Sequence, residues 1–186
     1  TAGDSAHART ILERVLDRPA SAGLRAEALS LLAVISQLEG SVLEGFDALE
    51  RALVDAGDDL ALRVQILVSL AWAHTHIAGE FAKTSCFIED AVAGATRLND
   101  PHLLSQALGM SAVVHILLGD GLEEQTLRRA VELESVQAAI TVMFRPAVHD
   151  AILSAWTGQF DAARAKFLAL RRGCIERGEE SELVFV

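Results

Sequence analysis

Residues 155–167 read Ala155-Trp-Thr-Gly158-Gln-Phe160-Asp-Ala-Ala163-Arg-Ala-Lys-Phe167, and their apolar spacing pauses at one glycine between two helical patterns. This pattern predicts a helix-turn-helix hairpin. Similar stretches surround three upstream glycines, so that Gly40, Gly79, Gly119 and Gly158 are separated by 39, 40 and 39 residues. A fixed period of this length is typical of a solenoid of helix pairs. The sequence therefore predicts an all-α fold of repeated hairpins with a period of 39–40 residues.

The same patterns predict the organisation of the chain. We expect residues 1–186 to form one array that starts with an unpaired helix at about 4–17. Full hairpins follow at about 22–57, 58–98, 100–134 and 146–177, and residues 179–186 are expected to begin a fifth, truncated hairpin of a longer protein. Within 135–146 the helical pattern weakens, and irregular, extended and helical structure all stay open for this segment.

Composition and charge exclude several classes of protein. The chain has 26 acidic and 16 basic residues, a net charge of −10, and its cations are not clustered as binding to a phosphate backbone requires. Two cysteines are too few for a disulfide framework, which favours a reducing compartment. No signal peptide is recognisable, and the apolar runs are shorter than a membrane-spanning helix needs. We therefore expect a cytoplasmic protein.

The residue types that usually carry chemistry do not form a catalytic or metal-binding pattern. His74 and His76 lie about 200° apart around a helix, so they do not readily share a metal, and adding His115 would require different helices to converge. Cys86 and Cys174 lie beside apolar residues and are expected in the core. No catalytic residue and no metal site is predicted.

The two tryptophans each come just before a turn. Trp72 and Trp156 are expected to pack against neighbouring helices. The polar neighbours of Trp72 leave open a role as a platform on which a ligand stacks.

The repeat units resemble a known repeat. The run Gly158-x-Phe160-x-x-Ala163-x-x-x-Phe167 is similar to the middle of a tetratricopeptide repeat, in which an aromatic residue follows the turn and small residues lie where helices touch. This resemblance implies a right-handed α-α superhelix with Phe160 and Phe167 packed inside it. The period of 39–40 residues is longer than the 34 residues of that repeat.

Longer phrases resemble a more specific family. Leu24-Arg-Ala-Glu-Ala-Leu-Ser-Leu-Leu-Ala and Arg177-Gly-Glu-Glu-Ser-Glu-Leu are similar to the central helical region of large ATP-binding, MalT-like transcriptional regulators of the LuxR type from actinobacteria. That family implies an N-terminal nucleotide-binding domain, a middle array that senses an effector or a partner, and a C-terminal helix-turn-helix. The chain has no phosphate-binding Gly-x-x-x-x-Gly-Lys-Ser/Thr loop and no basic recognition helix. ATP and DNA binding are therefore implied for a parent protein only, and no cofactor is expected here.

The tetratricopeptide resemblance also implies where a ligand would bind. Such arrays line their inner wall with residues 3, 6, 10 and 13 positions before each turn glycine. The polar residues at these positions are Glu27, Ser30, Gln37, Ser69, His76, Gln106 and Arg145. Together they predict a concave groove for a protein partner or a small effector, without direct contact to nucleic acid or membrane. A solvated face without a ligand is the alternative.

Three functions follow, in order of preference. The first is a non-catalytic sensing and protein-interaction array inside a transcriptional regulator. The second is a tetratricopeptide-type scaffold or adaptor in an unrelated multidomain protein. The third, a fragment of an all-helical enzyme, has no paired carboxylates, metal ligands or activated nucleophile in its favour.

Overall fold

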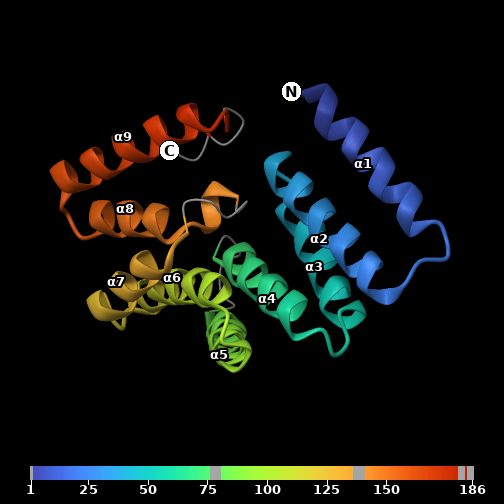
Figure 1. Ribbon diagram of the computed structural model, residues 1–186, viewed down its shortest axis with the longest axis horizontal. Coiled ribbons are helices and arrows are strands. Elements are labelled where there is room, and N and C mark those ends of the chain that lie inside the picture. Colours follow the sequence, from blue (N-terminus) through green and yellow to red (C-terminus); the bar gives the residue numbers. More distant parts are fainter. Residues whose placement is uncertain (1, 76–80, 136–140, 180–182, 184–186) are drawn as a thin grey trace. The chain divides into compact units, whose positions relative to one another are not determined.

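The computed structural model describes residues 2–75, 81–135, 141–179 and 183. Within these residues the chain forms nine α-helices and one short 3-10 helix, without a β-strand (Figure 1). The predicted all-α class is therefore confirmed. The chain divides into two compact units, Thr1–Gly94 and Ala95–Val186.

The first unit is a series of helices, of which the first three each pack against the next. These are α1 (Ala2–Leu16), α2 (Ala22–Leu38), α3 (Val42–Asp55) and α4 (Leu60–His74), followed by α5 (Phe81–Leu98), which runs past the unit's last residue. Its core joins small and branched side chains of α2, α3 and α4, such as Leu29, Leu49 and Leu70, each at most 1% exposed. Burying a side chain of this size is worth about 1.5–3 kcal/mol. Helix α4 contributes Ile66, Leu70 and Ala73 to the core beside the hairpin α2–α3.

A buried histidine completes this core. The ring of His74, at the end of α4, is 1% exposed and contacts Phe46 and Phe87 edge-on, with ring centroids 4.4 and 5.2 Å apart. Its two aromatic neighbours belong to α3 and α5. His74 therefore contributes to packing between three helices, whereas His76 lies outside the described residues.

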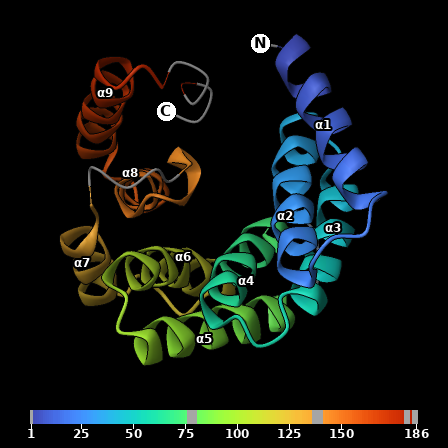
Figure 2. The same ribbon diagram turned by 45° about the vertical axis from the view of Figure 1, so that its right-hand side comes forward.

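The second unit has two hairpins and a short connecting helix. Its helices are α6 (Pro101–Leu118), α7 (Glu124–Leu133), the 3-10 helix η1 (Val142–Phe144), α8 (Pro146–Trp156) and α9 (Phe160–Glu176). Helix α6 packs on α7 and α8, and α8 packs on α7, η1 and α9 (Figure 2). Helix α8 is therefore the central element of this unit.

Most described helices that end at a turn share one hydrogen-bonding motif. Gly40, Gly119, Gly158 and Gly178 have φ values of 82°, 87°, 82° and 71°, and each donates to the carbonyl three residues earlier. The following amide donates to the carbonyl five residues before it, over 2.8, 3.0, 2.8 and 2.9 Å. Asn99, with φ 53°, occupies the same place after α5. This is the Schellman motif, which needs a left-handed residue and therefore favours glycine.

Replacing Gly158 by alanine is expected to destabilise the α8–α9 turn. An alanine in the left-handed region costs about 1–2 kcal/mol, while space is not limiting because no atom lies within 4 Å of the added Cβ. Asparagine tolerates this region better, as Asn99 already does. Urea unfolding should rank the stabilities as wild type, Gly158→Asn, then Gly158→Ala. Equal midpoints for the two variants would contradict this account of the turn.

The helix starts follow local sequence signals. The side chains of Ser21, Asp59 and Asp100 accept hydrogen bonds from the first-turn amides of α2, α4 and α6, and Pro101 occupies the first position of α6. In the segment 135–146, residues 142–144 form η1, whereas 136–140 lie outside the described residues. The expected fifth hairpin falls mostly on 180–182 and 184–186, which also lie outside them.

Helix α6 differs from the sequence expectation about membrane helices. By length and composition, its 18 residues are enough to cross a membrane, but 50% of the helix is buried inside the protein. Leu103, Ala107 and Met110 are among its buried side chains, and Ser105 donates to the Ala130 carbonyl of α7 at 2.8 Å. The buried core helix of a protein can be as long and as apolar as a membrane-spanning helix, so length and composition do not distinguish the two for α6.

Candidate functional site

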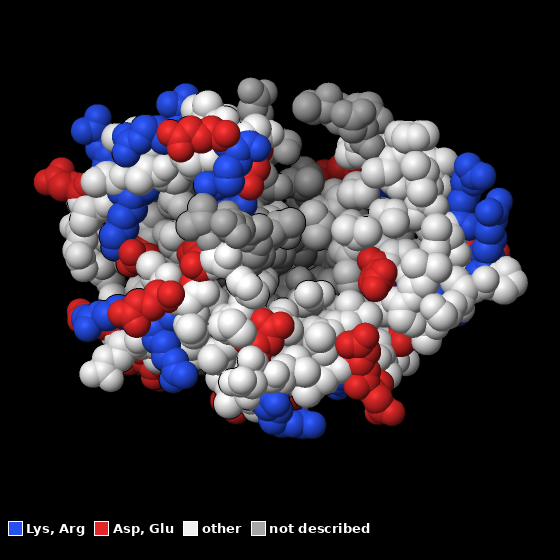
Figure 3. All heavy atoms as spheres, viewed as in Figure 1, with Lys and Arg blue, Asp and Glu red and all other residues white. Residues whose placement is uncertain are grey.

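A groove in the second unit lies between α7, α8 and α9. It consists of two depressions, with volumes of about 310 and 380 Å³, which share the lining residues Val131, Asp150 and Lys166. We call it the α7–α9 groove. Apolar side chains of α7 and α9, such as Leu127 and Leu170, form part of its wall, and charged side chains lie at both ends. Basic and acidic residues alternate over the face of this unit seen in Figure 3.

At one end, a carboxylate caps the beginning of α8. The residue before this helix, Arg145, makes no side-chain cap hydrogen bond, and Glu134 accepts one from the Ala147 amide instead, at 2.7 Å. A negative charge at a helix N-terminus is favourable because it faces the positive end of the helix dipole. Burial raises the pKa of the Glu134 carboxyl, and the Ala147 amide and the Arg145 charge oppose this shift.

Next to this cap, two arginines hold one glutamate. Arg145 donates from both terminal nitrogens to Glu179 at 2.7 and 3.0 Å, and Arg177 donates from Nε at 3.0 Å. These hydrogen bonds, first those from Arg145, lower the pKa of Glu179 to about 2. Arg145 is buried, so its charge joins the end of α9 to the start of α8 and is already neutralised.

Where the two depressions meet, a lysine joins α9 to α8. Lys166 Nζ donates to Asp150 Oδ1 at 2.7 Å and to Ser154 Oγ at 2.9 Å, and the Ser154 hydroxyl donates to the Asp150 carbonyl at 2.8 Å. An ammonium that donates to a carboxylate cannot also remove a proton from the serine. The trio therefore resembles an internal brace more than an activated nucleophile.

Ionic groups without an internal partner also line the groove. Arg128 on α7 is exposed, contributes to the first depression and makes no ion pair with another described residue. Glu124 and Glu132 lie on the same wall. The groove thus offers a ligand an apolar wall with charges of both signs in fixed positions, which suits an extended peptide or a small amphipathic molecule.

The predicted groove residues have different surroundings from one another. Glu27 is exposed, whereas Ser30, Ser69 and Gln106 are partly buried and donate to carbonyls four residues earlier in their own helices. The Gln37 Oε1 is buried and accepts no hydrogen bond in the described part of the chain.

The other two predicted residues have separate outcomes. His76 lies outside the described residues. Arg145 is the predicted residue that lines the α7–α9 groove, but its side chain is 8% exposed and bound to Glu179. Of the predicted groove residues that the structure describes, the others do not line the α7–α9 groove.

Sequence reasoning missed most residues of the groove. Arg128, Lys166 and Ala169 belong to second helices of hairpins, and the predicted wall used first helices alone. The only available signal was indirect: Asp150 and Lys166 are opposite charges on the two arms of one predicted hairpin.

Three predictions about packing were wrong. Cys86 is exposed, although Cys174 is fully buried as expected. Burial raises the pKa of the Cys174 thiol, which disfavours the thiolate. Phe160 is 71% exposed and Trp156 is 52% exposed, whereas Ala163 is buried. Trp156 is the last residue of α8 and Phe160 the first of α9, so both lie next to the turn at Gly158.

The remaining candidate chemistry stays apart. Within the described residues, no group of three or more histidine, cysteine, aspartate or glutamate side chains is arranged to hold a metal ion. The His115 ring lies 3.6 Å from Asp120 and 3.7 Å from Glu123 at the α6–α7 turn.

Comparisons of the whole chain with protein-family models, with curated proteins and with solved structures gave no match.

Proposed function

We propose that this chain is a non-catalytic binding module whose α7–α9 groove takes an extended peptide segment or a small effector. The observation that carries the proposal is the groove itself, which combines an apolar wall with internally paired charges and with Arg128, which makes no ion pair with another described residue. Such braces hold polar groups in place before a ligand arrives, which lowers the entropy cost of binding.

We further propose the setting that the sequence resemblance implies. In it, the hairpins form one right-handed tetratricopeptide-like superhelix inside a cytoplasmic transcriptional regulator of the LuxR type. Binding in the groove is then coupled to ATP- and DNA-binding domains that lie outside this chain. The Schellman turns at Gly40, Gly119 and Gly158 support a repeated hairpin unit. The alternative is a scaffold or adaptor with other flanking domains.

Blocking the groove is expected to abolish peptide binding. Ala169 lines the second depression and is exposed, so Ala169→Trp fills the space that a ligand would occupy. Linear peptides selected from a random display library against the wild-type chain should bind this variant at least about tenfold more weakly, a loss of about 1.4 kcal/mol. Titration calorimetry with the selected peptides measures the change.

The matched control is one turn earlier on the same helix. Ala165 is exposed but does not line the groove, so Ala165→Trp should bind the selected peptides as the wild type does. If both variants bind equally well, or if selection yields no peptide, the groove is not a peptide site. Reading the coding sequence on both sides of the chain tests the regulator setting. A phosphate-binding loop upstream and a helix-turn-helix downstream would support it, and flanks with neither would refute it.

A further inference from the structure

Helix α9 carries an apolar and basic stripe on its exposed side. Phe160, Leu168 and Ile175 are 71%, 42% and 49% exposed. With Arg164 and Arg171 they fall within an arc of about 80° at 100° per residue. Both arginines are exposed and make no ion pair with another described residue. We call these five residues the α9 stripe, which Asp161 and Arg172 flank.

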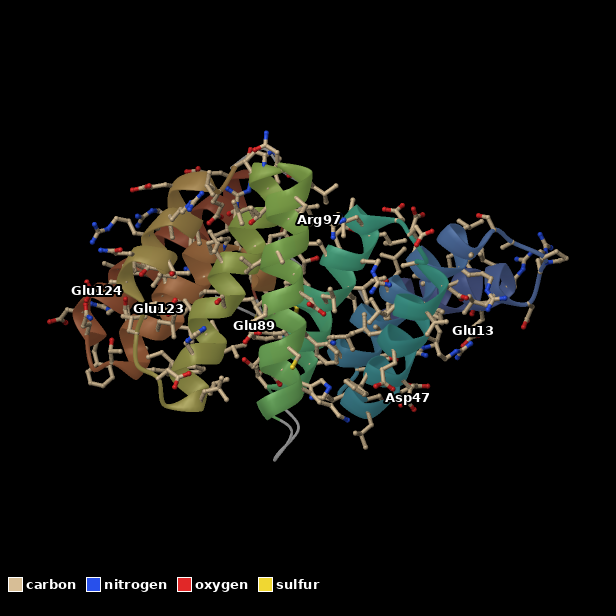
Figure 4. All side chains as sticks on the ribbon, turned by 90° about the horizontal axis from the view of Figure 1, so that it is seen from below. Glu13, Asp47, Glu89, Arg97, Glu123 and Glu124 are labelled. Atoms are coloured by element: carbon tan, nitrogen blue, oxygen red, sulfur yellow. The ribbon has the colours of Figure 1, made fainter. Side chains whose placement is uncertain are left out.

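Helix α3 carries a stripe of the opposite charge. Leu43 and Val54 are 69% and 80% exposed, and the exposed Asp47 and Glu50 lie between them in sequence. These four residues, the α3 stripe, span about 60° of arc and lie opposite the buried face of the helix. Figure 4 shows Asp47 pointing outward from α3. Neither acid is paired with another described residue, and Arg51 flanks the stripe.

The two stripes match along their helices. In α3, the midpoint between Leu43 and Val54 is also the midpoint between Asp47 and Glu50. In α9, the midpoint between Phe160 and Ile175 is likewise the midpoint between Arg164 and Arg171. We align the two helices at these midpoints and compare positions along the helix axis. Each arginine of α9 then lies within about 3 Å of an acidic residue of α3, and each apolar residue at an end of the α9 stripe lies within about 3 Å of an apolar end of the α3 stripe.

We propose that the α9 stripe of one copy of this chain docks on the α3 stripe of a second copy. Arg164 and Arg171 then pair with Asp47 and Glu50, and the apolar ends cover each other. Because the two stripes differ, the contact is heterologous. An assembly of any size then has one free α3 stripe at one end and one free α9 stripe at the other, so further copies can add to it. The contact of one helix pair is smaller than a standard interface, so the association is weak, depends on concentration and weakens with salt.

Charge reversal tests the contact in solution. The α9 variant is Arg164→Glu with Arg171→Glu, and the α3 variant is Asp47→Arg with Glu50→Arg. Sedimentation velocity over a range of concentrations at low salt should show association of the wild-type chain. In either variant alone the apparent dissociation constant should rise at least about tenfold, because like charges then face each other.

Mixing the two variants distinguishes this contact from non-specific association. The α3 variant carries arginines on both stripes and the α9 variant carries acidic residues on both. An equimolar mixture should therefore associate again, through native and reversed pairs of stripes, although neither variant associates alone. A chain with all four reversals should associate like the wild type. The controls are Glu89→Arg with Asp90→Arg on α5 and Arg97→Glu on α5 with Arg129→Glu on α7, which should leave association unchanged because these exposed residues lie outside both stripes and outside the groove.

Several outcomes would overturn the proposal. A wild-type chain that stays monomeric at every concentration has no such contact. Association that survives in either double variant uses another surface, and a mixture without dimers excludes the pairing of α3 with α9. Circular dichroism of each variant checks that its helices are intact. The substituted residues are exposed, so their native helix content is expected to persist.

Discussion

Replacing Gly109 by alanine is expected to destabilise the second unit by about 1–3 kcal/mol, because the helices there pack too closely for a methyl group. Gly109 lies in the middle of α6, where it faces the start of α8. A Cβ at this position would lie 2.8 Å from Nδ1 of His149 and 3.2 Å from Pro146. His149 is fully buried and Pro146 is held by its backbone, so neither can move aside without shifting α8.

The direction of this effect opposes helix propensity. In an unconstrained helix interior, alanine is about 1 kcal/mol more favourable than glycine, so a loss of stability isolates the packing cost. Gly23 in α2 provides the control, because no atom lies within 4 Å of its added Cβ. Urea unfolding of Gly23→Ala should show unchanged or slightly higher stability. A Gly109→Ala chain as stable as the wild type would show that α6 and α8 are not in close contact.

Lowering the pH from 6.5 to 4 is expected to cost about 3 kcal/mol of stability through His149 alone. Burial lowers the pKa of this imidazole to about 4 from its ordinary value of 6.5, although its hydrogen bond to the Met143 carbonyl opposes the shift. The distance from Nε2 to that carbonyl oxygen is 3.0 Å. Between these two pH values, the unfolded chain binds a proton that the folded chain does not. Stability therefore falls as the pH falls.

The variant His149→Gln separates this effect from other titrations. Glutamine keeps a donor that can reach the Met143 carbonyl but has no proton to gain. It is expected to be less stable than the wild type at neutral pH and to lose less stability on acidification. Urea unfolding at several pH values, with the two curves subtracted, gives the contribution of His149. Parallel curves between pH 6.5 and 4 would show that the imidazole is accessible to water.

A second acid-sensitive step is expected at lower pH. The pKa of Glu179 is lowered to about 2 from 4.5, so the stabilisation from its arginine partners is present above 4.5 and lost as the pH falls towards 2. This window lies below that of His149. In urea unfolding at several pH values, Glu179→Gln should lose less stability than the wild type between pH 4.5 and 2; equal losses would contradict this assignment.

The sequence by itself determined the class of the fold and most helix ends. A helix end depends on residues within one turn of it: Asp100 and Pro101 begin α6, and glycines close α2, α6 and α8. These interactions are local, so they can be predicted from the sequence. The superhelix, the domain organisation and the regulator family depend on more than local signals, and they stay predictions.

Tertiary structure alone decided which side chains form the groove. Arg145 pairs with Glu179 34 residues away, and Lys166 reaches Asp150 across 16 residues. Such pairs depend on how one helix is rotated against the next, and a shift of one residue turns a side chain by about 100° around its helix. The apolar pattern allows more than one rotation, so it predicted a buried Cys86 and a buried Phe160, which packing left exposed.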